Sequence, residues 1–174
     1  MRSQTNSPDT LLTVRTLPFP QNVIVGAFLV LAAAAFAAAP FDLSLRSVGI
    51  LLVTYLAFSV AGSPFAYLSA LIAPPVGLIG GDPNWLIMLP IIMSSTLLGV
   101  LGLEYAWRYP ALIISPLLAA APHFVAARLA EQSLFSIALP WLNPSSWLWL
   151  HALGALGGVL VCIFFDRRRE RLGG

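Results

Sequence analysis

Residues 85–103 read WLIMLPIIMSSTLLGVLGL and contain no charged side chain. A stretch of this kind matches the ~20 mostly apolar residues with which an α-helix crosses the hydrocarbon core of a bilayer. The whole chain has the same character: 59% of its 174 residues are hydrophobic and 9% are charged, whereas soluble domains average about 45–50% and about 25%. A soluble fold of this size could not cover so much apolar surface. The sequence therefore predicts an integral membrane protein.

Five further apolar runs accompany this stretch, separated by short polar or aromatic breaks. The runs cover residues 22–39, 48–62, 65–81, 111–127 and 147–165, and the breaks cover 41–46, 82–84, 104–109 and 128–145. We expect an all-α, polytopic bundle of six spans over residues 22–165. A polar N-terminal tail at 1–21 and an arginine-rich tail at 166–174 flank it.

The third run is the least regular. It contains Pro74 and Pro75 together with three glycines. Because proline removes a backbone donor and clashes with the preceding turn, we expect the helix to break near the middle of residues 65–81. In lipid such backbone needs protein or water partners. The segment either spans the membrane or re-enters it, and five spans with one re-entrant segment is the alternative.

The arginines predict the orientation of the chain. The tail at residues 166–171 reads DRRRER, and positively charged loops and tails stay in the cytoplasm. With six spans, seven of the nine basic residues lie inside and only Arg46 and Arg128 lie outside. With five spans the division is five to four. We therefore expect a multi-pass protein of the prokaryotic plasma (inner) membrane with both termini cytoplasmic.

Polar side chains on the predicted outer side form a candidate binding site. His123 lies in the outer part of the fifth span, and His151 follows Trp147 by four residues, only ~6 Å along a helix. Asp82 follows the broken third run at the same level. Polar groups inside spans are functional candidates by default, and a few of them within aromatic walls are typical of small-molecule sites. We predict that Asp82, His123, Trp147 and His151 line a substrate pocket; the alternative is an aromatic belt with two interfacial histidines.

Small residues form two further patterns. Ala34 and Ala38 share one face of the alanine-rich first span, and Gly154 and Gly158 share one face of the last. Such faces allow close approach between helices in lipid. They either pack inside the bundle or dock a partner subunit.

Catalytic patterns are missing from the sequence. It has neither the paired-histidine metalloprotease motif nor paired carboxylates within a span, and a serine nucleophile elbow is absent as well. Cys162 is the one cysteine, which excludes an internal disulfide and a thiolate metal cluster. The net charge of +2 is too small for nucleic-acid binding. We expect no enzyme activity, catalytic residue, metal or cofactor. An enzyme would need His123 and His151 within coordinating distance of one another.

The Ala34-to-Ala38 spacing and the irregular Pro/Gly region before Asp82 resemble the substrate-binding S subunits of energy-coupling-factor vitamin transporters. The resemblance is one of plan across most of the chain. It implies six spans, cytoplasmic ends, an outward pocket and an alanine-rich first helix that docks a coupling subunit. No vitamin-specific signature accompanies it. The cell-shape scaffold proteins of the MreD type look similar in size and layout and have no substrate. An uncharacterised family with neither role is the third possibility.

Overall fold

The computed structural model describes residues 21–106, 109–131 and 144–172, and this part of the chain is built from helices. In order they are α1 (Gln21–Ala38), α2 (Leu43–Ala61), α3 (Ser63–Val76), the 3-10 helix η1 (Gly77–Gly80), α4 (Pro83–Tyr105), α5 (Ala111–Glu131) and α6 (Pro144–Leu172). In the described residues six segments, α3 and η1 counted together, are long and apolar enough to cross a membrane. The chain is therefore a multi-pass, all-α integral membrane protein, as predicted. Most of the predicted N-terminal tail and of the long fifth connection lies outside the described residues.

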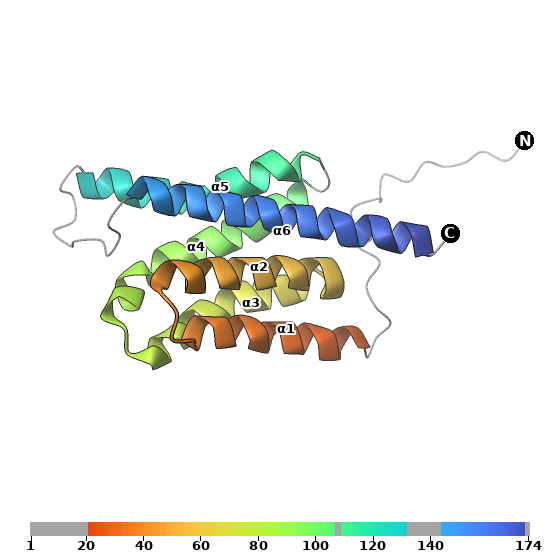
Figure 1. Cartoon of the computed structure of the whole chain (residues 1–174), viewed down its shortest axis with the longest axis horizontal. Coiled ribbons are helices and arrows are strands. Elements are labelled where there is room, and N and C mark those ends of the chain that lie inside the picture. Colours follow the sequence, from red (N-terminus) through yellow and green to blue (C-terminus); the bar gives the residue numbers. More distant parts are fainter. Residues whose placement is uncertain (1–20, 107–108, 132–143, 173–174) are drawn as a thin grey trace, which may run out of the picture.

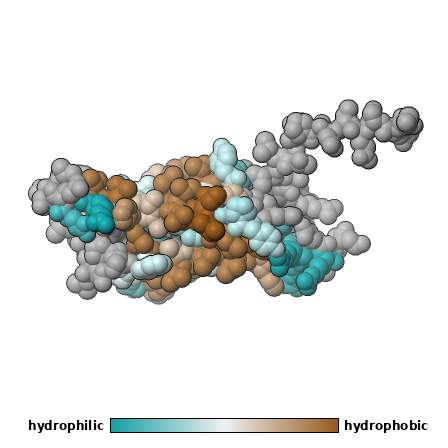
Figure 2. Space-filling model, turned by 90° about the horizontal axis from the view of Figure 1, so that it is seen from above, coloured by the Kyte–Doolittle hydropathy of each residue, from teal (hydrophilic) through white to brown (hydrophobic). Residues whose placement is uncertain are grey.

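The helices lie roughly along one axis and alternate in direction (Figure 1). α1 begins and α6 ends at the same end of the bundle. At the other end α1, η1 and α5 end while α2, α4 and α6 begin; we call this the Asp82 end. α6 has 29 residues and is ~43 Å long at 1.5 Å per residue, so it exceeds a hydrocarbon core of ~30 Å. A broad hydrophobic band occupies the middle of the molecule, and strongly hydrophilic residues gather toward the ends (Figure 2).

The start of α2 differs from the prediction. Residues 41–46 were expected to form a polar break, but α2 begins at Leu43. Asp42 caps this helix: its carboxylate accepts a hydrogen bond from the Leu45 amide at 3.2 Å and one from the Ser44 hydroxyl. The Ser44 hydroxyl, followed by local backbone amides, lowers the pKa of Asp42 below its ordinary value. A side-chain cap of this kind satisfies amides that a helix start leaves unpaired, so the span lengthens to include Arg46.

The third segment is interrupted, but later than expected. Pro74 and Pro75 lie inside the last turns of α3, and the change from α-helix to 3-10 helix comes at Gly77. The carbonyl oxygen of Pro74 accepts a hydrogen bond from the Trp85 indole at 2.8 Å. Side chains of neighbouring helices can satisfy backbone groups that prolines disturb in a span. α3 and η1 therefore form one candidate span over Ser63–Gly80.

Tyr55 of α2 lies at the centre of the packing between α2, α4, α5 and α6. It is fully buried, and its hydroxyl lies 2.5 Å from the Ser115 hydroxyl, which bonds the carbonyl oxygen of Gly99 at 2.8 Å. A Cβ at Gly158 would overlap the Tyr55 ring, and one at Gly154 would lie 2.9 Å from Val48. The Gly154–Gly158 face of α6 is thus occupied by α2 within the chain, which is the first of the two alternatives for this face.

Candidate functional site

Three of the four predicted site residues come together between α5 and α6. His123 lies on α5, and Trp147 and His151 lie one turn apart on α6, where residues four apart share a face. The ring centroids of His123 and His151 are 3.9 Å apart. The ring of Trp147 stacks on that of His151 at 5.4 Å with 16° between their planes, and lies 5.9 Å from His123. We call these three side chains the histidine–tryptophan cluster.

The cluster is buried, with exposed fractions of 1% for His123, 2% for His151 and 8% for Trp147. His151 Nδ1 lies 2.9 Å from the carbonyl oxygen of Trp147. Because a carbonyl only accepts hydrogen bonds, Nδ1 carries the proton and Nε2 presents a lone pair. Nε2 of His151 is buried and has no hydrogen-bond partner among the described residues. An unsatisfied buried acceptor costs about 1–3 kcal/mol, so this lone pair is available to a ligand.

The proximity of the two histidines meets the geometric condition set for an enzyme. His123 and His151 are in ring contact, although they were 28 residues apart in the sequence. A protein metal site takes at least three His, Cys, Asp or Glu ligands in its usual forms. In the described part of the chain no group of three or more such residues could hold a metal ion. Among the described residues the cluster therefore lacks a third ligand for a metal ion. It can bind a ligand that donates a hydrogen bond to His151 Nε2 and stacks a flat ring on Trp147.

Asp82, the fourth predicted site residue, lies apart from the cluster in an ion pair. Its carboxylate caps α4 by accepting from the Asn84 amide at 3.0 Å, and it lies 3.3 Å from the Arg46 guanidinium. Cap and ion pair occupy the carboxylate, so its contacts among the described residues are structural.

Arg46 organises the Asp82 end, and the sequence did not single it out as a functional residue. It is 4% exposed and donates to the carbonyl oxygens of Ala37 at 2.7 Å and Gly77 at 2.9 Å. Its guanidinium stacks 4.0 Å from the ring centroid of Trp85. Trp85, a residue type that often lies at the membrane interface, is fully buried, because its ring is enclosed between Arg46 and Gly77. Arg46 thereby joins the end of α1 and the start of η1 to the start of α4.

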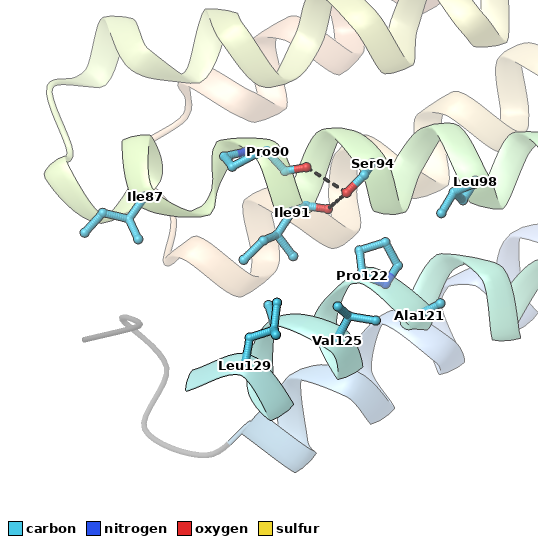
Figure 3. A pocket seen from close by; sticks show the side chains of 10 residues that line it. Ile87, Pro90, Ile91, Ser94, Leu98, Ala121, Pro122, Val125 and Leu129 are labelled. Carbon is cyan, nitrogen blue, oxygen red and sulfur yellow. Dashed lines mark hydrogen bonds between the residues drawn. The ribbon is translucent and has the colours of Figure 1, made fainter. Parts of the chain in front are cut away.

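A cavity of about 520 Å³ lies between α4 and α5 (Figure 3). Its lining residues are Ile87, Pro90, Ile91, Ser94, Leu98, Ala121, Pro122, Val125, Ala126 and Leu129. We call it the α4–α5 groove. None of the four predicted site residues lines it. Two of its wall residues, Ile91 and Ala126, also pack against the core group that contains Trp147. The sequence feature that could have indicated this groove is the occurrence of Pro90 and Pro122 inside two consecutive spans, since proline disturbs the helix around it.

The alanine face of α1 lies partly on the outside of the bundle. Ala33 and Ala37 are fully buried, whereas Ala34 is half-buried and Ala38 is exposed. The inward face is therefore one residue away from the predicted docking pair. Docking of a partner at Ala34 and Ala38 stays a prediction.

The fold and the cluster define the class: a multi-pass helical membrane protein with a buried histidine pair among its spans. No protein-family model, no curated protein and no solved structure matches the chain. The functional proposal therefore depends on the geometry of the chain itself.

Proposed function

We propose that this protein is the small-molecule-binding subunit of a membrane uptake complex and that the histidine–tryptophan cluster is its binding site. The observation that carries the proposal is the buried Nε2 lone pair of His151, beside His123 and Trp147. Ionisable side chains inside membrane spans are rare and mark ligand or ion pathways by default. The proposal gives the cluster a binding role and no catalytic step.

The cluster limits the chemistry of the ligand. The lone pair of His151 Nε2 takes a hydrogen-bond donor, and the face of Trp147 takes a flat ring, since aromatic rings stack in offset geometry. All three rings are nine-tenths buried or more. Ligand entry therefore requires α5 and α6 to separate at the Asp82 end. The arginine distribution supports an outward position for this end, with the half-buried Ala34 and exposed Ala38 facing a coupling subunit.

Thermal unfolding of the purified protein in detergent tests the proposal. The wild type is screened against water-soluble vitamins and transition-metal ions, in parallel with His151→Asn and Trp149→Phe. The asparagine amide replaces the Nδ1 donor to the Trp147 carbonyl but has nothing at Nε2. Trp149 lies on the same helix and is 64% exposed, so its variant is the matched control. We expect a ligand to raise the Tm of wild type and Trp149→Phe but not of His151→Asn. Stabilisation of all three alike, or of none, contradicts the proposal.

An exposed apolar stripe on α1 favours a second function, that of a non-catalytic scaffold of the cell envelope. Ile24, Phe28 and Leu31 of α1 are each about two-thirds exposed and follow a spacing of four and three residues. This spacing puts them on one stripe that a partner helix can cover. A scaffold of the MreD type needs such faces and no ligand. It predicts that no compound in the screen raises the Tm.

A further inference from the structure

The α4–α5 groove has a surface chemistry that suits hydrocarbon. Nine of its ten lining residues are apolar. The tenth, Ser94, donates its hydroxyl back to carbonyl oxygens of its own helix, at 2.7 Å to Pro90 and 3.1 Å to Ile91, and these bonds are drawn in Figure 3. A guest that seeks hydrogen bonds gains little from such walls, because desolvating its polar groups costs free energy that the groove does not return.

The groove also has the depth of one leaflet. Along α4 it extends from Ile87 to Leu98, a rise of ~16 Å at 1.5 Å per residue, which is about half of a ~30 Å hydrocarbon core. It begins near the Asp82 end, where Ile91 of α4 faces Leu129 of α5 and Ile87 lies beyond them, and it stops in mid-span (Figure 3). Exposed Pro90 and Val125 place its opening on the outer surface of the bundle. A partner helix would need a seam along the whole span, whereas an acyl chain needs one leaflet.

Opposite charges lie beside the membrane-surface end of the groove. Arg128 and Glu131 flank the lining residue Leu129 in the last turns of α5, are both more than half exposed, and pair at 3.0 Å. A zwitterionic headgroup likewise carries one anionic phosphate and one cationic ammonium. The arginine favours the phosphate and the glutamate the ammonium, whereas an anionic headgroup would be repelled by Glu131.

We propose that the α4–α5 groove is a lipid site that holds one acyl chain of a zwitterionic phospholipid from the leaflet at the Asp82 end. Its headgroup lies at Arg128 and Glu131. This site is separate from the histidine–tryptophan cluster and does not depend on the function proposed for it.

Native mass spectrometry of the full chain, released from nanodiscs of equal phosphatidylethanolamine and phosphatidylglycerol, tests the lipid site. We expect the wild type to retain a single phosphatidylethanolamine. Ala121→Leu fills the deep end of the groove, and Ser94→Leu narrows it from the opposite helix. Each is expected to lower the retained lipid by about fivefold or more, since overpacking an occupied site is unfavourable. Ala35→Leu, at an exposed alanine of α1, is the control and retains the lipid.

The contact of the lipid headgroup with Arg128 and Glu131 is tested separately. The double variant Arg128→Gln with Glu131→Gln is expected to keep a lipid but to lose the preference for phosphatidylethanolamine. Equal retention by wild type, Ala121→Leu and Ser94→Leu overturns the proposal, as does retention of phosphatidylglycerol in preference, of no lipid, or of a second copy of the chain. The thermal unfolding of both leucine variants shows that they are folded. If one of them unfolds, the other decides the result.

Discussion

The ring centroids of His123 and His151 lie 3.9 Å apart across the contact between α5 and α6, with the ring planes tilted by 37°. This relationship ties two spans together through polar side chains, although apolar side chains would pack there without leaving Nε2 of His151 unsatisfied. Local arrangements that cost stability are concentrated at functional sites. The pair is therefore the feature of the fold that packing alone explains least.

We expect the ligand-free His151→Asn variant to unfold within ~1 kcal/mol of wild type. It loses ring stacking, worth about 0.5–1.5 kcal/mol, but also removes a buried acceptor that lacks a partner, a gain of about 1–3 kcal/mol. The measurement is thermal or denaturant unfolding in detergent. A purely structural side chain at this depth would cost about 2–5 kcal/mol on truncation, and a loss of that size would assign His151 to packing.

Arg46→Gln is expected to destabilise the protein far more than Arg128→Gln. Removing Arg46 leaves the Ala37 and Gly77 carbonyls and Asp82 without their donor. Breaking a buried pair costs about 3–5 kcal/mol, and the 30% exposure of Asp82 favours the lower end. Arg128 is 62% exposed in its pair with Glu131, and such surface pairs contribute about 0–1 kcal/mol. Equal shifts in Tm for the two variants would exclude Arg46 as the residue that holds the Asp82 end together.

Gly158 and Gly157 form a matched pair for testing the packing of α6. A Cβ at Gly158 would overlap the buried Tyr55 ring, whereas one at Gly157 meets nothing within 4 Å. We expect Gly158→Ala to lower the free energy of unfolding by about 1–3 kcal/mol through overpacking. Gly157→Ala should raise it by roughly 0.5–1 kcal/mol, since alanine is the better helix former. Unfolding of both variants by one method checks this, and stabilisation by Gly158→Ala would show that α6 does not pack on α2 as described.

Hydropathy predicted the spans because the solvent of a membrane helix is uniform. A run such as 85–103 needs no knowledge of its neighbours to be assigned, and α4 extends it by two residues at each end. The depth of His123 and His151 was predictable for the same reason, since residue number converts directly to height along a span. Their contact also required α5 and α6 to be neighbours, which the sequence leaves open.

Tertiary contacts explain what the sequence did not predict. Tryptophan and arginine often lie at the membrane interface. Trp85 and Arg46 are nevertheless buried against each other, because the carbonyl oxygens of Ala37 and Gly77 both lie within hydrogen-bond reach of the Arg46 guanidinium. The α4–α5 groove likewise depends on which helices are neighbours, since Pro90 and Pro122 line it from facing helices (Figure 3). The pairing of helices is a property of the whole chain.

Cysteine labelling tests the predicted sidedness of the membrane protein. Ile79 at the Asp82 end and Tyr105 at the opposite end are 80% and 83% exposed. We expect a membrane-impermeant maleimide to label Ile79→Cys in intact cells and Tyr105→Cys only in inverted vesicles, because the arginine-rich end stays in the cytoplasm. Wild type is the control, since its one cysteine, Cys162, is buried. Labelling with the reverse pattern would place the Asp82 end in the cytoplasm.

Nitrogen-15 NMR of the imidazole rings tests the binding site most directly. The chain has two histidines, so His151→Asn assigns both rings. From the proposed binding site we predict that His151 carries its proton on Nδ1, and that a ligand which raises the Tm shifts the Nε2 resonance of His151. A proton on Nε2 in the ligand-free protein, or an Nε2 resonance that no stabilising ligand moves, would contradict it.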